Sequence, residues 1–196
     1  MKDGEYTDNE VIKLIKLHRG LLWRFDLETD VVTIRREPVS FAYRDVLDGS
    51  ARMLLPAHFV QIPDELARLR YLSEHRPQLI LSGNDPTDNI CVSRIARNGR
   101  DLQEAMAVMQ DSISQTAPET VFYEKGLTVG KNCEGHWFEY KSFTINDEAY
   151  NIQFLLGSDQ TETVLLGAFN CCIRYFEEWK PYILKALEYT EIFDIH

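Results

Sequence analysis

The sequence of 196 residues lacks the long apolar runs of a membrane protein. Its longest runs, such as Val164–Phe169, are far shorter than the ~20 residues that a transmembrane helix needs. No signal peptide is visible either, because Lys13 and Lys16 interrupt the apolar stretch that follows the N-terminus. We therefore expect a cytoplasmic protein that does not enter membranes.

Positive charge is also in short supply. The chain has 21 Lys and Arg against 31 Asp and Glu, which gives a net charge of −10. Phosphate backbones and anionic lipid surfaces repel such a chain, so nucleic acid and membrane surfaces are excluded as expected partners. The negative charge favours solubility and attracts a basic protein partner.

Cysteine is scarce, with four residues at Cys91, Cys133, Cys171 and Cys172. The even number does not indicate a disulfide framework, since the chain is neither small nor recognisably secreted. Cys171 and Cys172 are adjacent, and on a strand their side chains would point to opposite faces. We predict that all four are reduced and act as small apolar side chains.

Motifs for catalysis, phosphate binding and metal binding are missing. The sequence contains no GxSxG elbow, no GxxxxGK[ST] and no GxGxxG. Cys133 and His136 have half-site spacing for zinc, and Cys171 and Cys172 would have to complete it, but no second paired spacing exists. We therefore predict no catalytic residues, no metal and no cofactor. A Ser–His–Asp set assembled only in space stays open.

The composition is that of an ordinary globular chain, with 44% hydrophobic and 27% charged residues. We predict a single domain over 1–196, in which residues 1–50 form an extension packed on a core of 51–196. The extension is predicted as a helix at 8–17 and a hairpin of strands Leu21–Phe25 and Val31–Arg35 that ends at Pro38.

The core residues alternate between strand and helix patterns, which predicts an α+β fold with an antiparallel sheet flanked by helices. Asp101 caps a helix whose apolar stripe runs from Leu102 to Ile113. The other predicted elements are a strand at Ala51–Leu55, a helical turn from Pro63, strands at Gln78–Ser82, Ile90–Ile95, Val121–Tyr123 and Leu127–Val129, a meander of His136–Ile145, Tyr150–Leu156 and Thr163–Cys171, and a helix at Tyr175–Phe193.

This order of elements resembles the α/β sandwich of the PsbP proteins of photosystem II and the Ran-binding import factor Mog, over about residues 51–193. Small bacterial relatives, including chaperones of type VI secretion effectors, share the pattern. The residues that carry the resemblance are Leu55-Pro56-Ala57-His58-Phe59, Gly130 and Gly135 before the meander, and Glu177-Glu178-Trp179 at the last helix. The resemblance implies a PsbP/Mog-like sandwich and a non-enzymatic binding or assembly protein.

The meander supplies the candidate binding residues. Tyr150, Ile152 and Phe154 form an apolar face that must pack on a helix. We assign the large apolar residues of a second, mixed face as the candidate binding surface: Trp137, Phe143, Leu155 and Phe169. Two alternatives stay open for this face: a helix covers it, or it forms an open groove for an apolar segment of a partner.

Three functions follow. The first is a non-catalytic adaptor or chaperone-like domain that binds a protein or peptide segment. The second is a homodimeric structural subunit, in which Trp23 and Phe25 pair across a two-fold axis. The third, least favoured, is a hydrolase-type enzyme with a cleft lined by His58, His136 or the cysteines.

Overall fold

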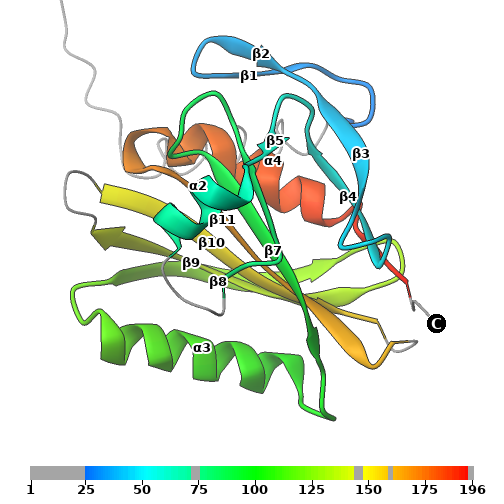
Figure 1. The fold of residues 1–196 in the computed structure, drawn as a ribbon, viewed down its shortest axis with the longest axis vertical. Coiled ribbons are helices and arrows are strands. Elements are labelled where there is room, and N and C mark those ends of the chain that lie inside the picture. The colour runs from blue at the N-terminus through cyan, green and yellow to red at the C-terminus, as the bar shows by residue number, and fades with distance from the viewer. Residues whose placement is uncertain (1–24, 72–75, 144–147, 159–160, 194–196) are drawn as a thin grey trace, which may run out of the picture.

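The computed structural model describes residues 25–71, 76–143, 148–158 and 161–193. These residues form an α+β sandwich of antiparallel sheets and helices, as predicted (Figure 1). The sheets contain two, three and seven strands. The helix predicted at 8–17 lies outside the described residues.

The seven-stranded sheet is antiparallel throughout and has the order β5-β6-β7-β11-β10-β9-β8. The predicted meander is confirmed as β9-β10-β11, and the two short strands predicted at 121–129 are one strand, β8. The strands are β5 (Val60–Gln61), β6 (Leu79–Ser82), β7 (Asn89–Ala96), β8 (Val121–Val129), β9 (Glu134–Phe143), β10 (Glu148–Gly157) and β11 (Thr163–Cys172).

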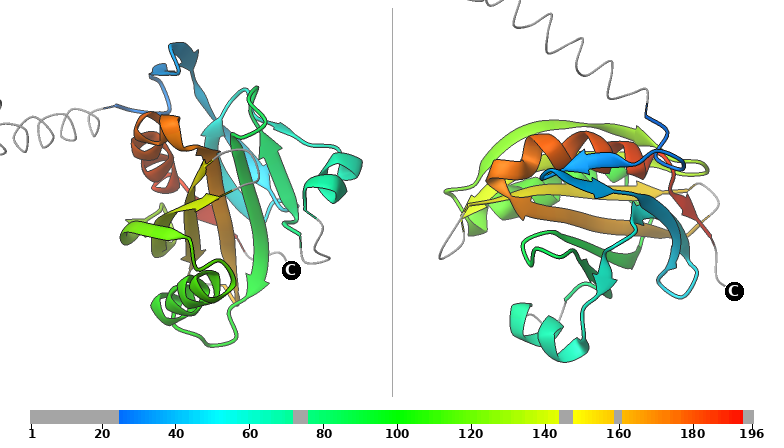
Figure 2. Two further views of the ribbon diagram at one scale, coloured as in Figure 1. Left: turned by 90° about the vertical axis from the view of Figure 1, so that its left-hand side faces the viewer. Right: turned by 90° about the horizontal axis from the view of Figure 1, so that it is seen from above.

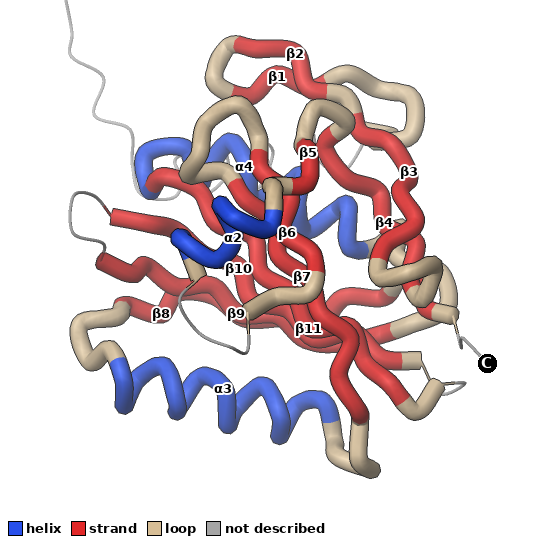
Figure 3. The backbone as a smooth tube through the Cα atoms, in the orientation of Figure 1, coloured by secondary structure: helices blue, strands red, loops and turns tan. Residues whose placement is uncertain are grey.

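Helices cover both faces of this sheet (Figure 3). Helix α3 (Leu102–Thr116) packs on one face, here called the α3 face, through Leu102 and Met106. Its predicted cap is confirmed, because the Glu104 N–H donates to Asp101 Oδ1 at 3.0 Å. The short helix α2 (Asp64–Arg70) lies toward the β5–β6 edge, away from β8 (Figure 2).

Helix α4 (Phe176–Leu187) covers the opposite face, here called the α4 face, and follows a 3₁₀ turn at Ile173–Tyr175. It buries Trp179 and Ile183 in the main core. The helix is shorter than the predicted 175–193, because the chain leaves it to form β12 (Glu191–Ile192), which pairs with β4.

The N-terminal hairpin differs from the prediction. It consists of β1 (Val32–Ile34) and β2 (Glu37–Val39), so Pro38 lies inside a strand and does not end the unit. Arg35 and Arg36 form its turn with φ of 54° and 63°, the backbone that two-residue hairpin loops require.

The polar stretch at 26–30 closes on itself and does not join two paired strands. The Asp26 carbonyl accepts the N–H groups of Thr29 and Asp30, at 3.2 and 2.8 Å. Asp30 Oδ2 in turn accepts the Asp26 N–H at 2.9 Å. Phe25 is therefore outside any strand, and residues 21–24 lie outside the described part of the chain.

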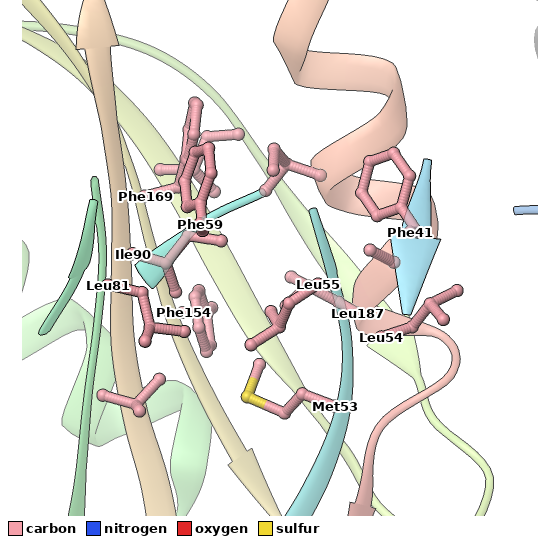
Figure 4. Close-up of a cluster of buried hydrophobic side chains, with 14 of the residues drawn as sticks. Phe41, Met53, Leu54, Leu55, Phe59, Leu81, Ile90, Phe154, Phe169 and Leu187 are labelled. Atoms are coloured by element: carbon pink, nitrogen blue, oxygen red, sulfur yellow. The ribbon is translucent and has the colours of Figure 1, made fainter. Parts of the chain in front are cut away.

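A three-stranded sheet, β12-β4-β3, completes the sandwich, with β3 at Phe41–Val46 and β4 at Ala51–Pro56. Strands β3 and β4 pair across the boundary that the sequence placed at residue 50. The main core lies between these strands, α4 and the large sheet (Figure 4). Its labelled side chains are Phe41, Met53, Leu54, Leu55, Phe59, Leu81, Ile90, Phe154, Phe169 and Leu187.

Candidate functional site

The four predicted binding residues do not share one face. Trp137 stands directly opposite Phe154 in the β9–β10 pairing, so both lie on the α4 face. Phe143 and Phe169 follow the same alternation, and Phe169 pairs with Ile152. Leu155 points to the α3 face. The predicted single surface of these residues is therefore wrong, because the strand register places Trp137 beside Phe154 and not behind it.

Two of the four are not accessible to a partner. Leu155 is fully buried and packs in the cluster of Leu102 and Met106 on α3. Phe169 is fully buried against the Trp179 ring of α4, with ring centroids 5.3 Å apart. Helices therefore cover these two positions, and neither lines an open groove.

Trp137 is half-buried and closes over the edge strand β8. Its ring lies against the backbone of Gly126, where an added Cβ would come within 2.9 Å of Cζ2. Its Nε1 donates to the Leu127 carbonyl at 3.3 Å. Trp137 therefore fixes the position of β8 and leaves Phe143 as the exposed member of the predicted set.

Three exposed apolar residues lie together where β8, the outer strand of the large sheet, begins and β9 ends. Val121, Tyr123 and Phe143 are 43%, 48% and 45% exposed. Val121 pairs with Lys141, two residues before Phe143, so these side chains lie on the α4 face at one corner of the sheet. We call Val121, Tyr123 and Phe143 the edge patch.

A β-bulge shapes the patch. The β8–β9 register shifts between Phe122 and Lys125, so Tyr123 and Glu124 together stand opposite Glu139. A bulge bends its strand and re-aims the side chains beside it. Tyr123 lies on the α4 face at the bulge, and its ring stacks on Phe176 with centroids 6.5 Å apart and planes at 6°.

Glu139 holds the bulge in place. Its side chain is 2% exposed, and its Oε1 accepts the Glu124 N–H at 3.1 Å and Lys180 Nζ at 2.9 Å. The Tyr150 hydroxyl donates to Oε2. Burial raises the pKa of Tyr150 above its usual value, so this hydroxyl keeps its proton. Each oxygen of the buried carboxylate is therefore satisfied.

Lys180 connects the bulge to α4 as well. Its Nζ lies 2.8 Å from Glu124 Oε2 and 2.9 Å from Glu139 Oε1. Phe176, one turn earlier on α4, packs on Tyr150 with ring centroids 4.9 Å apart. The edge patch is thus attached to a helix and to the sheet, and it is a preformed surface.

Two exposed carboxylates adjoin the patch along the chain, because Glu119 lies two residues before Val121 and Glu177 follows Phe176, which stacks on Tyr123. Glu119 precedes β8, and Glu177 lies on the first turn of α4; both are exposed. Lys141 Nζ is bound to Glu148 at 3.1 Å and lies 4.7 Å from the centre of the Phe143 ring. The Lys141 ammonium beside Phe143 is therefore already paired, whereas the salt bridges of the described residues do not include Glu119 or Glu177.

The described residues offer no candidate metal centre, since they contain no group of three His, Cys, Asp or Glu side chains suited to one. All four cysteines are buried and none is in a disulfide. Burial raises the pKa of the Cys91, Cys133 and Cys171 thiols, that of Cys133 to about 11. Thiols of this kind are poor nucleophiles at neutral pH.

The two histidines proposed for a cleft have ordinary structural surroundings. His58 packs edge-on against Phe59 with ring centroids 5.0 Å apart, and burial lowers its pKa. His136 lies on β9 opposite Leu155 on one side and Leu127 on the other. The structure brings neither residue into a described catalytic set.

A hollow of about 340 Å³ lies beside α2. Its polar side chains carry both signs of charge, as in Asp64 and Arg68, and are exposed or half-buried. Since no buried polar side chain among the lining residues is directed at a ligand, we assign none to this hollow.

Comparison with solved structures identifies the fold. Cyanobacterial PsbP (CyanoP) from Synechocystis sp. PCC 6803 superimposes with a TM-score of 0.57 at 5% identity, covering 78% of this chain and 92% of that one. The Saccharomyces cerevisiae Ran-binding protein Mog1p gives 0.55 at 10% identity, covering 80% and 97%. LpqN, involved in cell envelope biogenesis of Mycobacterium tuberculosis, gives 0.50 at 11% identity, covering 82% and 95%.

No protein-family model matches the sequence, and no curated protein matches it either. The chain is an α+β sandwich with an exposed apolar patch at one sheet edge. Its architecture is PsbP/Mog-like, as the resemblance implied. Among the described residues, no helix is both long and apolar enough to cross a membrane.

Proposed function

We propose that the protein is a non-catalytic protein-binding module and that a partner's apolar segment binds at the edge patch. The observation that carries this proposal is the grouping of Val121, Tyr123 and Phe143, three large side chains each more than two-fifths exposed, at an open corner of the large sheet. Exposed apolar groups gathered in this way mark interaction surfaces.

Rigidity makes the patch suited to binding. Tyr123 is fixed by its stacking on Phe176, and the bulge beneath it is fixed by Glu139 and Lys180. A preformed surface loses little conformational entropy when a partner binds. Aromatic side chains with one polar end, such as Tyr123, are enriched at protein interfaces.

The charge around the patch defines the partner's chemistry. Glu119 and Glu177 adjoin it along the chain, and the net charge of the whole protein is −10. A partner segment with aromatic or aliphatic residues for the patch and Lys or Arg beside them complements this surface. The bulge interrupts the backbone ladder here, so side chains supply most of the contact.

The likeness to Mog1p agrees with a binding role, since that protein is described as Ran-binding. It does not identify the partner of this chain, because fold alone does not determine function. The buried thiols and the missing catalytic motifs favour binding over the hydrolase alternative.

A displayed library of random peptides is the direct test. The wild-type protein is expected to enrich peptides that combine apolar and basic residues. Phe143→Glu adds a charge inside the patch and is expected to weaken the selected peptides at least tenfold in calorimetry. Val108→Glu is the matched control, because Val108 is 63% exposed on α3 outside the patch.

Both variants must first match the wild type in thermal melting. Peptides that bind Phe143→Glu within about twofold of the wild type would contradict the proposal. Peptides that lose affinity equally for both variants would contradict it as well, because the effect would then be one of net charge. Tyr123→Glu supplies an independent second position in the patch.

A further inference from the structure

The second half of β8 carries its own exposed apolar surface, on the opposite side of the sheet. Leu127 and Val129 are 71% and 67% exposed. They pair with His136 and Glu134, whose neighbours on β10 put them on the α3 face. The bulge shifts the alternation of side chains along β8. Leu127 and Val129 therefore point to the opposite face from the edge patch.

Residues 125–129 form a regular strand after the bulge. Lys125, Leu127 and Val129 point to the α3 face, and Gly126 and Thr128 to the α4 face. On its outer side this strand has no partner among the described residues. Such an open edge is a template for another strand.

This strand is complementary to itself. A two-fold axis through Leu127, perpendicular to the sheet, pairs it antiparallel with a second copy. Lys125 then stands opposite Val129, and Gly126 opposite Thr128, so every pair shares a face, as strand pairing requires. An axis between two residues would place opposite faces together. An axis at Gly126 or Thr128 would match fewer residues of the regular run.

The charges fit the same axis. Lys125 of one copy lies opposite Val129 of the other, and Glu134 is the next residue across that sheet. Neighbouring strands are about 4.8 Å apart, so the two charged groups can meet above the Val129 side chain. Neither Lys125 nor Glu134 has an ion-pair partner among the described residues.

We propose that the protein self-associates as a two-fold dimer through β8, with Leu127 at the axis and the large sheets of both copies joined edge to edge. The pairing buries the two Leu127 and two Val129 side chains together on the α3 face. The Trp137 indole lies over Gly126 on the α4 face and donates to the Leu127 carbonyl, whose second lone pair accepts the Leu127 N–H of the other copy in this pairing.

The dimer is expected to depend on concentration. Five paired residues form less contact than the ~1,600 Å² of a standard interface, so we expect weak, reversible association. The symmetric contact is isologous, so it closes at two copies and does not extend into fibres. The edge patch faces the other side of the sheet, and its function as a binding surface is tested separately.

Sedimentation velocity from about 1 to about 300 µM is the first test. The wild type is expected to move from 22.8 kDa to twice that mass as concentration rises. Leu127→Glu is expected to remain monomeric over the whole range. Leu69→Glu is the matched control, because Leu69 is 75% exposed on α2, which lies away from β8 (Figure 2).

Cross-linking locates the axis. In the dimer the two Leu127 positions are close enough for a disulfide, so Leu127→Cys is expected to form a covalent dimer when a mild oxidant removes two electrons and two protons from the thiols. The four native cysteines are buried and give little background. Leu69→Cys, equally accessible, is expected to remain uncoupled.

A charge exchange tests the register. Lys125→Glu is expected to weaken the dimer at least fivefold, and adding Glu134→Lys to it is expected to restore association. If Leu127→Glu does not fold, the Lys125→Glu variant and its double variant with Glu134→Lys still test the proposal. A wild type that stays at 22.8 kDa throughout overturns the proposal. So does a dimer that persists in Leu127→Glu or resists cross-linking at position 127.

Discussion

Lys180 Nζ lies 2.9 Å from Glu139 Oε1, and this ion pair connects helix α4 to the interior of the sheet. The Glu139 side chain is almost fully buried, whereas the Lys180 side chain is 15% exposed. A carboxylate placed this deep depends on its partners, because an unpaired buried charge is strongly unfavourable.

Removal of Lys180 is expected to destabilise the protein. Lys180→Met leaves Glu139 buried without its counter-charge, which costs about 3–5 kcal/mol for an ion pair of this kind. The double variant Lys180→Met/Glu139→Gln removes both charges and is expected to recover part of that loss. Urea denaturation measures both values. A loss below about 1 kcal/mol for Lys180→Met would show that the pair contributes little.

A second buried acid makes stability depend on pH. Asp88 is buried and bound by the Arg35 guanidinium at 2.9 Å, while Asp85 binds the same group at 2.6 Å. Burial outweighs the arginine and raises the pKa of Asp88 from 3.8 to about 6. The folded protein therefore binds this proton more readily than the unfolded chain does.

The sign of the Asp88 effect follows from linkage. A raised pKa in the folded state means that the free energy of unfolding increases as pH falls from above about 6 toward about 4. His58 acts in the opposite direction, since burial lowers its pKa below 6.5 and its contribution is lost as pH falls. Asp85, whose pKa is lowered, acts only below the Asp88 window.

Asp88→Asn isolates this group. Its stability relative to the wild type is expected to be greatest near neutral pH and to decline as pH falls through about 6, because the wild-type carboxyl then becomes neutral as well. Thermal melts of both proteins between pH 4 and pH 8 give the difference. Asp45→Asn, at an exposed ion pair with Arg52, is expected to show no such trend. A pH-independent difference for Asp88→Asn would contradict the prediction.

The sequence predicted the elements that depend on local pattern. The apolar alternation in Tyr150–Leu156 and the stripe after Asp101 are local signals, and both elements are present. The two-residue turn at Arg35 and Arg36 could not be predicted in this way, because the residues typical of a positive φ are Gly and Asn, and neither is present. The acidic stretch at 26–30 looked like a hairpin loop but is a turn closed by Asp26.

The candidate site was harder to predict, because it depends on register and on strand order. Phe143 belongs to the exposed patch, but Phe169 and Leu155 are buried by helices from distant parts of the chain. Val121 is exposed because β8 is the outer strand of the sheet, and strand order cannot be predicted from a local sequence pattern. Gly126 was the one usable signal, since a glycine inside a strand marks a bulge or a close approach.

Gly135 is expected to be intolerant of any side chain. An added Cβ would lie 1.9 Å from the Leu155 carbonyl oxygen, and backbone atoms of a central strand cannot move aside. Gly135→Ala is therefore expected to prevent folding or to lower stability by several kcal/mol, as overpacking of a core does in severe cases. Gly99→Ala is the control, with open space around the Cβ and only the strain of a positive φ, about 1 kcal/mol. Equal effects of the two substitutions, measured by thermal melting, would contradict the placement of β9 against β10.

The four thiols are expected to be unreactive in the folded protein. Cys91, Cys133, Cys171 and Cys172 are all buried, and burial raises the pKa of the first three, so little thiolate is present at neutral pH. A disulfide reagent that reports thiolate attack is expected to react slowly with the native protein, at a rate set by local opening, and rapidly with four thiols per chain in urea. Leu127→Cys supplies a positive control, since its thiol is exposed on β8. Fast reaction of a native thiol in the wild type would show that one of the four is accessible and would reopen the choice between a binding protein and a thiol-dependent enzyme.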